Sequence, residues 1–426
     1  MIELNPPERI YFDQAATTWP KLPEAVQAAV EFINHCGATS GRGAYASARS
    51  ADRWLSQARH NLAQLVGTDG GDQIAFCSSG THALNALLLG LIQPGDRVVT
   101  TAIEHNSVLR PLEQLRIRET IELSIVPCDV NGRVDLQMAE KMLDQPTRMV
   151  VISHASNVTG CLQDIGKWSE LTQRANALLI VDVSQTLGYM PISMDQLGID
   201  ALATAGHKGL GALAGTGFIA ASSRVQSQLQ PLMFGGTGTA SERMDFTPLW
   251  PQTVEVGNLN MPAIASMAAA AAVWLRHSKA TPQQEQLSKH PNAQRAMLAW
   301  QPAFARFLAG LRRLADTGVL RLVGHIASPT PAEIDSTGSR ASQPTDDAWL
   351  PIVSIVADGW DIHELAAVLD GNFGIEARAG YHCAALIHSF LNTQATGGTL
   401  RFSLGHKTTF EEVDQVLEAL TAIVQT

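Results

Sequence analysis

Short apolar runs alternate with helix-like patterns over residues 72–220. The segment 81–92 carries apolar residues at helical spacing and follows a run typical of a buried strand. Strand patterns occur at 72–79, at the start of 96–107, and at 121–129, 148–157, 177–185, 200–206 and 215–222. Strands that alternate with helices form a mostly parallel sheet with helices on both faces. We therefore expect an α/β fold in this part of the chain.

Polar residues collect where several of these strands end. They are the run 78–82, His105, Asn157, Asp182, Gln185 and the loop around Lys208. Ligands of open parallel sheets lie beyond the carboxyl ends of the strands. The pattern therefore predicts one ligand site built from distant parts of the sequence.

The pattern changes after about residue 260. The alanine-rich run 261–275 predicts a buried helix, because it is too short to span a bilayer. Strand patterns at 320–325, 349–357 and 398–406 and helix patterns at 361–374 and 410–424 follow. These elements indicate a second, smaller α+β domain.

The domain prediction follows from this change. The large domain is expected over 16–258, and the small domain over 1–15 and 259–426. Two polar stretches, near 277–293 and 326–347, are rich in Pro, Ser, Thr and Gln and are expected to be surface insertions in the small domain.

Composition excludes several classes of protein. The chain has 426 residues, 45% of them hydrophobic, and a formal net charge of -10. It shows no long basic run, no signal-peptide pattern and no apolar run that could span a membrane, so we expect a soluble protein without a nucleic-acid or membrane partner. Its five cysteines are scattered and form no C-x-x-C pair, so neither a disulfide framework nor a metal site is indicated and a reducing cytoplasm fits.

The stretch "ATAGHKGLGALAGTGF", residues 203–218, places one lysine among glycines and small residues. Glycine allows a close approach of the backbone to a ligand, so Lys208 is interpreted as the group that meets the ligand. The alternative for this stretch alone is a surface lysine in a glycine turn. Its occurrence with the other polar strand ends favours the ligand site.

An amine, a carboxylate, a histidine and a phosphate-sized loop together suggest pyridoxal 5'-phosphate. A lysine such as Lys208 can form a Schiff base with the coenzyme, and burial lowers its pKa so that it can act as nucleophile and base. Asp182, at the end of an apolar strand, can hold the pyridine nitrogen protonated. The run "SSGTHALN", residues 78–85, offers backbone N–H groups at a helix start, which suits a phosphate.

These residues lie within motifs that resemble the class V aminotransferase family, in its cysteine desulfurase and selenocysteine lyase branch. The resemblance runs nearly end to end and rests on the segments 11–26, 41–67, 78–91, 103–112, 156–160, 181–188, 206–217, 235–242, 378–388 and 398–414. It implies a fold of the PLP-dependent transferase fold type I, with a large domain around a mostly parallel sheet and a smaller α+β domain.

The resemblance also implies a role for each matching residue. Lys208 would carry the coenzyme, His105 would stack on its ring and help to move protons, and Asp182 would pair with the ring nitrogen. The ring oxygen would be bound by Asn157 and Gln185, and the phosphate by Thr81, His82 and His207. Thr237 in "GGTG" would reach the phosphate of the neighbouring subunit, which implies a homodimer with shared active sites. Arg401 would bind the substrate carboxylate, with support from Arg378 and Asn157.

Cys383 decides the reaction that the resemblance implies. In "RAGYHCAALIH" it lies close in sequence to Arg378, His382 and His388, and nearby cations favour a thiolate. In a cysteine desulfurase this residue takes sulfur from L-cysteine as a persulfide and leaves L-alanine, and the sulfur can pass to an acceptor protein. Taken alone, Cys383 would be read as a buried structural thiol, but its position in this motif favours the nucleophile.

Other functions stay open at this point. Selenocysteine lyase, a class V C–S lyase or epimerase, and a silent scaffold that binds a sulfur carrier are the alternatives. A dinucleotide-dependent dehydrogenase is disfavoured, because no G-x-G-x-x-G follows an early strand. Two departures from the family pattern stand out: Ala205, where a hydroxyl residue usually meets the phosphate, and Asn258, where threonine is common. With Ala205, either Thr204 or water would have to supply the missing hydrogen bond.

Overall fold

The computed structural model describes residues 9–41, 43–238, 242–245, 247–278, 299–325 and 349–424. The two predicted polar insertions lie almost entirely outside these residues. No helix in the described ranges combines the length and the hydrophobicity needed to cross a bilayer.

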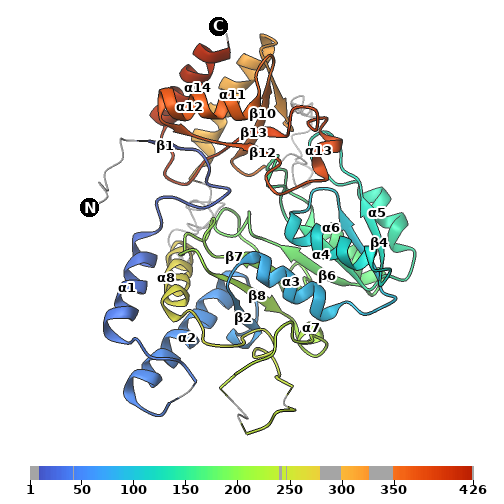
Figure 1. Ribbon diagram of the computed structural model, residues 1–426, viewed down its shortest axis with the longest axis vertical. Helices are drawn as coiled ribbons and strands as arrows, with labels where there is room; N and C mark the ends of the chain where they lie inside the picture. The colour runs from blue at the N-terminus through green and yellow to red at the C-terminus, as the bar shows by residue number, and fades with distance from the viewer. Residues whose placement is uncertain are drawn as a thin grey trace, which may run out of the picture.

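A seven-stranded sheet forms the centre of the large domain, drawn in the lower part of Figure 1. Its strands are β2 (Ile74–Cys77), β3 (Arg97–Thr101), β4 (Glu122–Val126), β5 (Met149–Ser153), β6 (Leu178–Asp182), β7 (Ala201–Ala205) and β8 (Gly217–Ala221). Their order across the sheet is β2-β8-β7-β6-β5-β3-β4. Only β8 runs antiparallel to its neighbours, so the predicted mostly parallel α/β sheet is confirmed.

The strands are apolar on both faces because helices cover both. Along β6, Leu178 and Ile180 pack on one side of the sheet, whereas Leu179 and Val181 pack on the other. One layer contains α3 (Gly80–Leu91), α4 (Asn106–Ile117) and α7 (Ser223–Gln226). The other contains α1 (Pro23–His35), α2 (Ala46–Leu65), α5 (Leu136–Leu143), α6 (Ile165–Arg174) and α8 (Met261–Ser278). This alternation explains why the strand sequences read as continuous apolar runs.

Helix α8 packs in the core of the large domain. Its Met267, Ala271 and Trp274 are buried together with residues of α1 and α2, and the Trp274 indole donates a hydrogen bond to the Leu210 carbonyl at 3.1 Å. The boundary predicted at residue 258 assigns this helix to the small domain. The alanines of α8 allow close packing against α1 and α2, which cover the large sheet. The contacts of α8 are therefore with the large domain.

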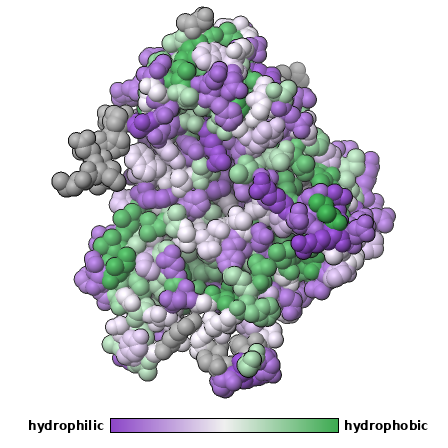
Figure 2. Space-filling model, in the orientation of Figure 1, coloured by the Kyte–Doolittle hydropathy of each residue, from purple (hydrophilic) through white to green (hydrophobic). Residues whose placement is uncertain are grey.

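The small domain is built on a four-stranded antiparallel sheet, ordered β12-β13-β10-β9. Its elements are α11 (Gln301–Asp316), β9 (Leu320–Val323), β10 (Ile352–Ala357), α12 (Ile362–Phe373), β11 (Ile375–Glu376), β12 (Arg378–Gly380), α13 (Ile387–Phe390), β13 (Thr399–Ser403) and α14 (Phe410–Val424). The N-terminal strand β1 (Ile10–Tyr11) pairs with β11 in parallel, so the start of the chain joins this domain. Hydrophilic residues gather along the boundary between the two domains (Figure 2).

Three aromatic rings tie the start of the chain to the small domain. The ring of Phe307 on α11 lies 5.4 Å from that of Phe12 and 5.5 Å from that of Phe402 on β13, each in an edge-to-face arrangement. All three side chains are fully buried. Edge-to-face aromatic pairs add to the free energy of burial.

We predict that Phe307→Ala lowers the free energy of unfolding by about 3–5 kcal/mol, because it leaves a cavity at this aromatic cluster. Urea unfolding followed by circular dichroism measures the change. Phe373→Ala is the matched control, since Phe373 is 41% exposed. Equal losses in the two variants would contradict the assigned role of the cluster.

Candidate active site

A cavity of about 230 Å³ lies at the carboxyl ends of the large-domain strands, where the small domain meets them. Ten of the predicted site residues line it: Lys208, Cys383, His105, Asp182, Asn157, Gln185, Thr81, His207, Arg378 and Arg401. Within the described residues, no group of three or more His, Cys, Asp and Glu side chains is placed to hold a metal ion. The cavity therefore gathers most of the residues that were singled out along the chain.

Lys208 follows β7 at the wall of this cavity. Burial lowers the pKa of its amine to about 8. Asp182 raises this pKa, whereas Arg401 and Arg378 lower it further. An amine with this pKa has a sizeable neutral fraction near neutral pH and can act as a nucleophile.

Asp182 ends β6 and faces the same cavity. One of its carboxylate oxygens accepts a hydrogen bond from the Ser184 backbone N–H at 2.8 Å, and the residue is only 8% exposed. Its other oxygen atom remains available to a cationic group of a ligand.

His105 is held as a neutral imidazole. Its Nδ1 accepts a hydrogen bond from the Ser107 backbone N–H at 3.0 Å and lies 2.7 Å from the Ser107 hydroxyl. Burial, with a further contribution from Lys208, lowers its pKa to about 4. Because Nδ1 is an acceptor here, the ring proton of the neutral form sits on Nε2.

The start of α3 makes one end of the cavity suitable for an anion. Ser79 caps the helix by accepting a hydrogen bond from the His82 N–H, and Ser79, Gly80 and Thr81 line the cavity. The first N–H groups of a helix have no partner within it and attract negative charge. His207, whose Nδ1 lies 3.0 Å from the Thr17 hydroxyl, borders the same cavity.

Ala205 borders the cavity from the end of β7. Side chains alternate along a strand, so Thr204 points to the other face, and its buried hydroxyl has no hydrogen-bond partner within the described residues. Thr204 therefore cannot replace the hydroxyl group that the family pattern places at position 205.

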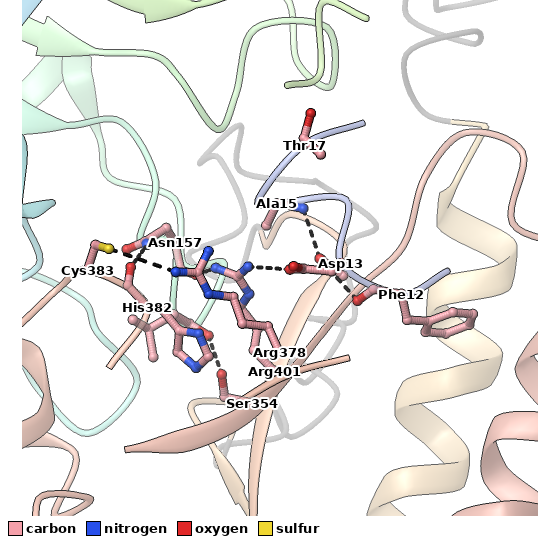
Figure 3. A network of polar contacts seen from close by, with 12 residues as sticks. Phe12, Asp13, Ala15, Thr17, Asn157, Ser354, Arg378, His382, Cys383 and Arg401 are labelled. Atoms are coloured by element: carbon pink, nitrogen blue, oxygen red, sulfur yellow. Dashed lines mark hydrogen bonds and ion pairs between the residues drawn. The ribbon is translucent and has the colours of Figure 1, made fainter. Parts of the chain in front are cut away.

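Two arginines, Arg378 and Arg401, line the cavity, and Figure 3 shows them next to each other between Cys383 and Asp13. Arg401 on β13 and Arg378 on β12 are directly paired across the small sheet. Arg401 is 1% exposed; it donates to Asp13 at 2.6 Å and to the Asn157 carbonyl at 3.0 Å. Desolvation, opposed mainly by Asp13, lowers the Arg401 pKa below its ordinary value. With two cations and one carboxylate, this end suits the carboxylate group of a substrate.

Cys383 lies at the mouth of the cavity and is exposed. Its sulfur accepts a hydrogen bond from an Arg378 guanidinium nitrogen at 3.8 Å. Cys383 and the residue before it, His382, both adopt left-handed backbone angles, with φ of 57° and 49°. This strained turn is held by the Asn157 amide, which donates to the His382 carbonyl at 2.6 Å, and by the Asn106 N–H, which donates to the Cys383 carbonyl at 2.7 Å.

The structure separates two predicted residues from the others. The His82 imidazole turns back to Ser78, with Nδ1 3.2 Å from both the backbone nitrogen and the hydroxyl, and it borders a different cavity. Thr237 does not line the Lys208 cavity of its own chain. The role inferred for Thr237 involves the neighbouring subunit, whereas the phosphate role inferred for His82 would need its imidazole to turn away from Ser78.

Sequence reasoning missed Asp13 and Ser153. Asp13 lies inside the matched segment 11–26 and forms an ion pair with the Arg401 guanidinium at 2.6 Å. Ser153 ends β5, as Asp182 ends β6, and it lines the cavity. The signal for Ser153 was its position at the end of β5, but the predicted strand 148–157 ran past it and placed the polar end at Asn157.

Comparisons with known proteins find relatives over nearly the whole chain. A model of the family "Aminotransferase class-V" matches residues 10–302 and 330–416. A probable cysteine desulfurase of Methanothermobacter thermautotrophicus is 30% identical over 98% of this chain and 95% of its own length. A solved cysteine desulfurase of Thermococcus onnurineus is 25% identical, with a TM-score of 0.81 over 98% of this chain and 95% of that one. One from Escherichia coli, at 22% identity and a TM-score of 0.77 over 98% and 95%, shares the fold.

We predict that iodoacetamide modifies Cys383 before the other cysteines of the folded protein. Cys77, Cys128 and Cys161 are buried, and burial raises the Cys128 pKa to about 12. Peptide mass spectrometry over a time course measures the order. Cys383→Ala should lose the fast-labelled peptide, whereas early modification of a buried cysteine would contradict the exposure described here.

Proposed function

The chain belongs to the class V aminotransferase family, and on that premise we propose that it is a cysteine desulfurase, which converts L-cysteine to L-alanine and keeps the sulfur as a persulfide on Cys383. The observation that carries this proposal is an exposed thiol beside Arg378, at the mouth of the cavity that Lys208 lines. Several relatives over nearly the whole chain bear the same activity in their names.

The cavity fits pyridoxal 5'-phosphate as the cofactor. Lys208 would carry it, Asp182 would meet the ring nitrogen, and the start of α3 with His207 would meet the phosphate. His105 would lie against the ring, and Asn157 and Gln185 would face its oxygen. When bound, the coenzyme draws electrons away from the substrate carbon atoms.

The arginine end of the cavity would hold the substrate. The Arg401 guanidinium is fixed by Asp13 and the Asn157 carbonyl, so it is already oriented when a carboxylate arrives. A preorganised cation loses little conformational freedom on binding. Arg378, which also contacts the Cys383 sulfur, would place the substrate thiol near the nucleophile.

Cys383 would then accept the sulfur. Its thiolate attacks the substrate sulfur, an S–S bond forms, and the C–S bond breaks. The electron pair of the broken bond stays with the substrate carbon, which takes a proton to give alanine. Lys208, with a pKa of about 8, and the neutral His105 are the groups placed to accept and return protons.

The exposed thiol also suits transfer of sulfur to an acceptor protein. We further infer a homodimer, in which Thr237 meets the phosphate of the neighbouring site. Phe234, Met244 and Leu249 in the same region are 77%, 105% and 78% exposed, as expected for a surface that a second subunit covers. All five cysteines are free, which fits a reducing cytoplasm.

We predict that Cys383→Ala abolishes release of alanine from L-cysteine, by about 100-fold or more, because the sulfur then has no nucleophile. The Cys383 peptide of the wild type should gain one sulfur atom when cysteine is added without reductant. Alanine analysis and mass spectrometry measure the two effects.

Two controls accompany this experiment. Cys36→Ala, in which a half-buried cysteine is removed, should keep wild-type activity, and Lys208→Ala should bind no coenzyme. A parallel assay with selenocysteine tests the lyase alternative. Full activity of Cys383→Ala on cysteine would show that the enzyme is a C–S lyase or another class V enzyme.

Ala205→Ser is predicted to slow the loss of coenzyme. A serine hydroxyl at this cavity position can reach the anion held by α3, and a hydrogen bond to a charged group is worth about 1.5–3 kcal/mol, which corresponds to about 10-fold or more in affinity. The decay of visible absorbance during dialysis checks this, with Thr204→Ser as control. Faster loss from Ala205→Ser than from the wild type would contradict the placement of the phosphate.

A further inference from the structure

Glu104 is a fully buried carboxyl group that the proposed reaction does not use. It lies between the end of β3 and the start of α4, and its next residue is His105. Its exposure is 0%, and the two residues before it, Ala102 and Ile103, are buried apolar side chains. A carboxyl group in such surroundings is costly unless its charge is balanced or a proton is retained.

Three donors converge on this carboxyl group. One oxygen accepts from the Thr101 hydroxyl at 2.5 Å and from the Ser153 backbone N–H at 3.0 Å. The other accepts from the Ser153 hydroxyl at 2.7 Å. These bonds favour the charged form, but burial outweighs them, and the pKa of Glu104 is raised to about 7.

Ser153 connects Glu104 to the cavity. Ser153 on β5 is directly paired with Asp182 on the parallel strand β6, and both residues line the cavity. Asp182 also raises the Glu104 pKa, and it is the one charged residue whose effect on this carboxyl group is resolved within the described chain. An ionised Glu104 therefore adds to the negative charge that Asp182 presents to the cavity.

We infer that Glu104 is a positioning residue for the coenzyme site. It acts through Ser153 and Asp182, and its ionisation determines how much negative charge lies next to the coenzyme ring. This inference rests on the proposed function, because it needs pyridoxal phosphate at Lys208. It assigns a task to a carboxyl group that lies behind the wall of the cavity and contacts no substrate.

The Ser153 hydroxyl gives this task a structural basis. When Glu104 is ionised, the hydroxyl donates to it, as the 2.7 Å contact allows. When Glu104 is protonated, it can donate to the same hydroxyl oxygen, and the serine hydrogen becomes available on the cavity side. The hydrogen bonding of the Ser153 hydroxyl and the charge of Glu104 thus change together.

The test is a pH titration of the visible absorbance of the holoenzyme without substrate. The wild type should show a spectral step near pH 7, where Glu104 ionises. Glu104→Gln keeps the size of the side chain but cannot ionise, so this step should vanish. The main change in visible absorbance, which reports the protonation of the bound coenzyme, should also respond. Without the negative charge of Glu104, its midpoint should move to lower pH by about half a unit or more.

A second variant guards against a folding defect in Glu104→Gln. Ser153→Ala removes one hydrogen bond that stabilises the charged form of Glu104, so the step near pH 7 should move to higher pH. Glu255→Gln is the matched control. Glu255 is also a buried carboxyl, but it pairs with Arg59 at 2.6 Å outside the cavity, and this variant should titrate like the wild type.

The coenzyme-free protein provides an independent measurement. The Glu104 pKa is about 7 in the folded chain and 4.5 in the reference state, so the folded chain retains a proton between these values. The free energy of unfolding therefore falls as pH rises across this window. In Glu104→Gln this fall should be less steep, and the difference in slope should correspond to up to about one proton.

The outcomes separate this inference from the proposed function. A wild type that takes up no coenzyme overturns both. A Glu104→Gln protein that binds coenzyme and titrates like the wild type overturns this inference alone. So does a change in unfolding stability with unaltered spectral titrations, because it would show that Glu104 has only a structural role.

Discussion

The buried guanidinium of Arg401 is the group on which the arrangement of the two domains depends. It belongs to β13 of the small sheet, yet its hydrogen bonds go to Asp13 in the N-terminal segment and to the Asn157 carbonyl in the large domain. A cation removed from water must be paired, and removal of one partner from a buried pair costs several kcal/mol. The three parts of the chain are therefore held in one relative position by a residue that also lines the cavity.

The large sheet explains why the remaining groups meet. Parallel strands bring their carboxyl ends to one edge, so Ser153 and Asp182 lie side by side without any motif that links them in sequence. The helix layer that contains α3 directs a positive helix end toward the same edge. Ser153, Asp182 and the start of α3 are consequently supplied to the cavity by the large domain, and Arg378 and Arg401 by the small domain.

Much of this could be predicted from sequence, because each large-sheet strand is a short apolar run with polar residues after it. All seven strands, the α/β class and most of the lining residues were predicted in this way. The contributions of Asp13 and Glu104 were not, because their importance arises from partners that are distant in space or hidden behind a strand. The packing of α8 was missed because an alanine-rich helix shows no polar face that would indicate which domain it covers.

The ion pair of Asp13 and Arg401 joins residues 388 positions apart, and this separation has a consequence for biosynthesis. A chain that emerges from the ribosome presents Lys208 and the whole large sheet well before β13 is made. The pair of arginines that lines the cavity can form only when β13, the last strand, has been added to the small sheet. An incomplete chain therefore already carries Lys208 and Asp182 but lacks the ion pair that joins the N-terminal segment to the small sheet.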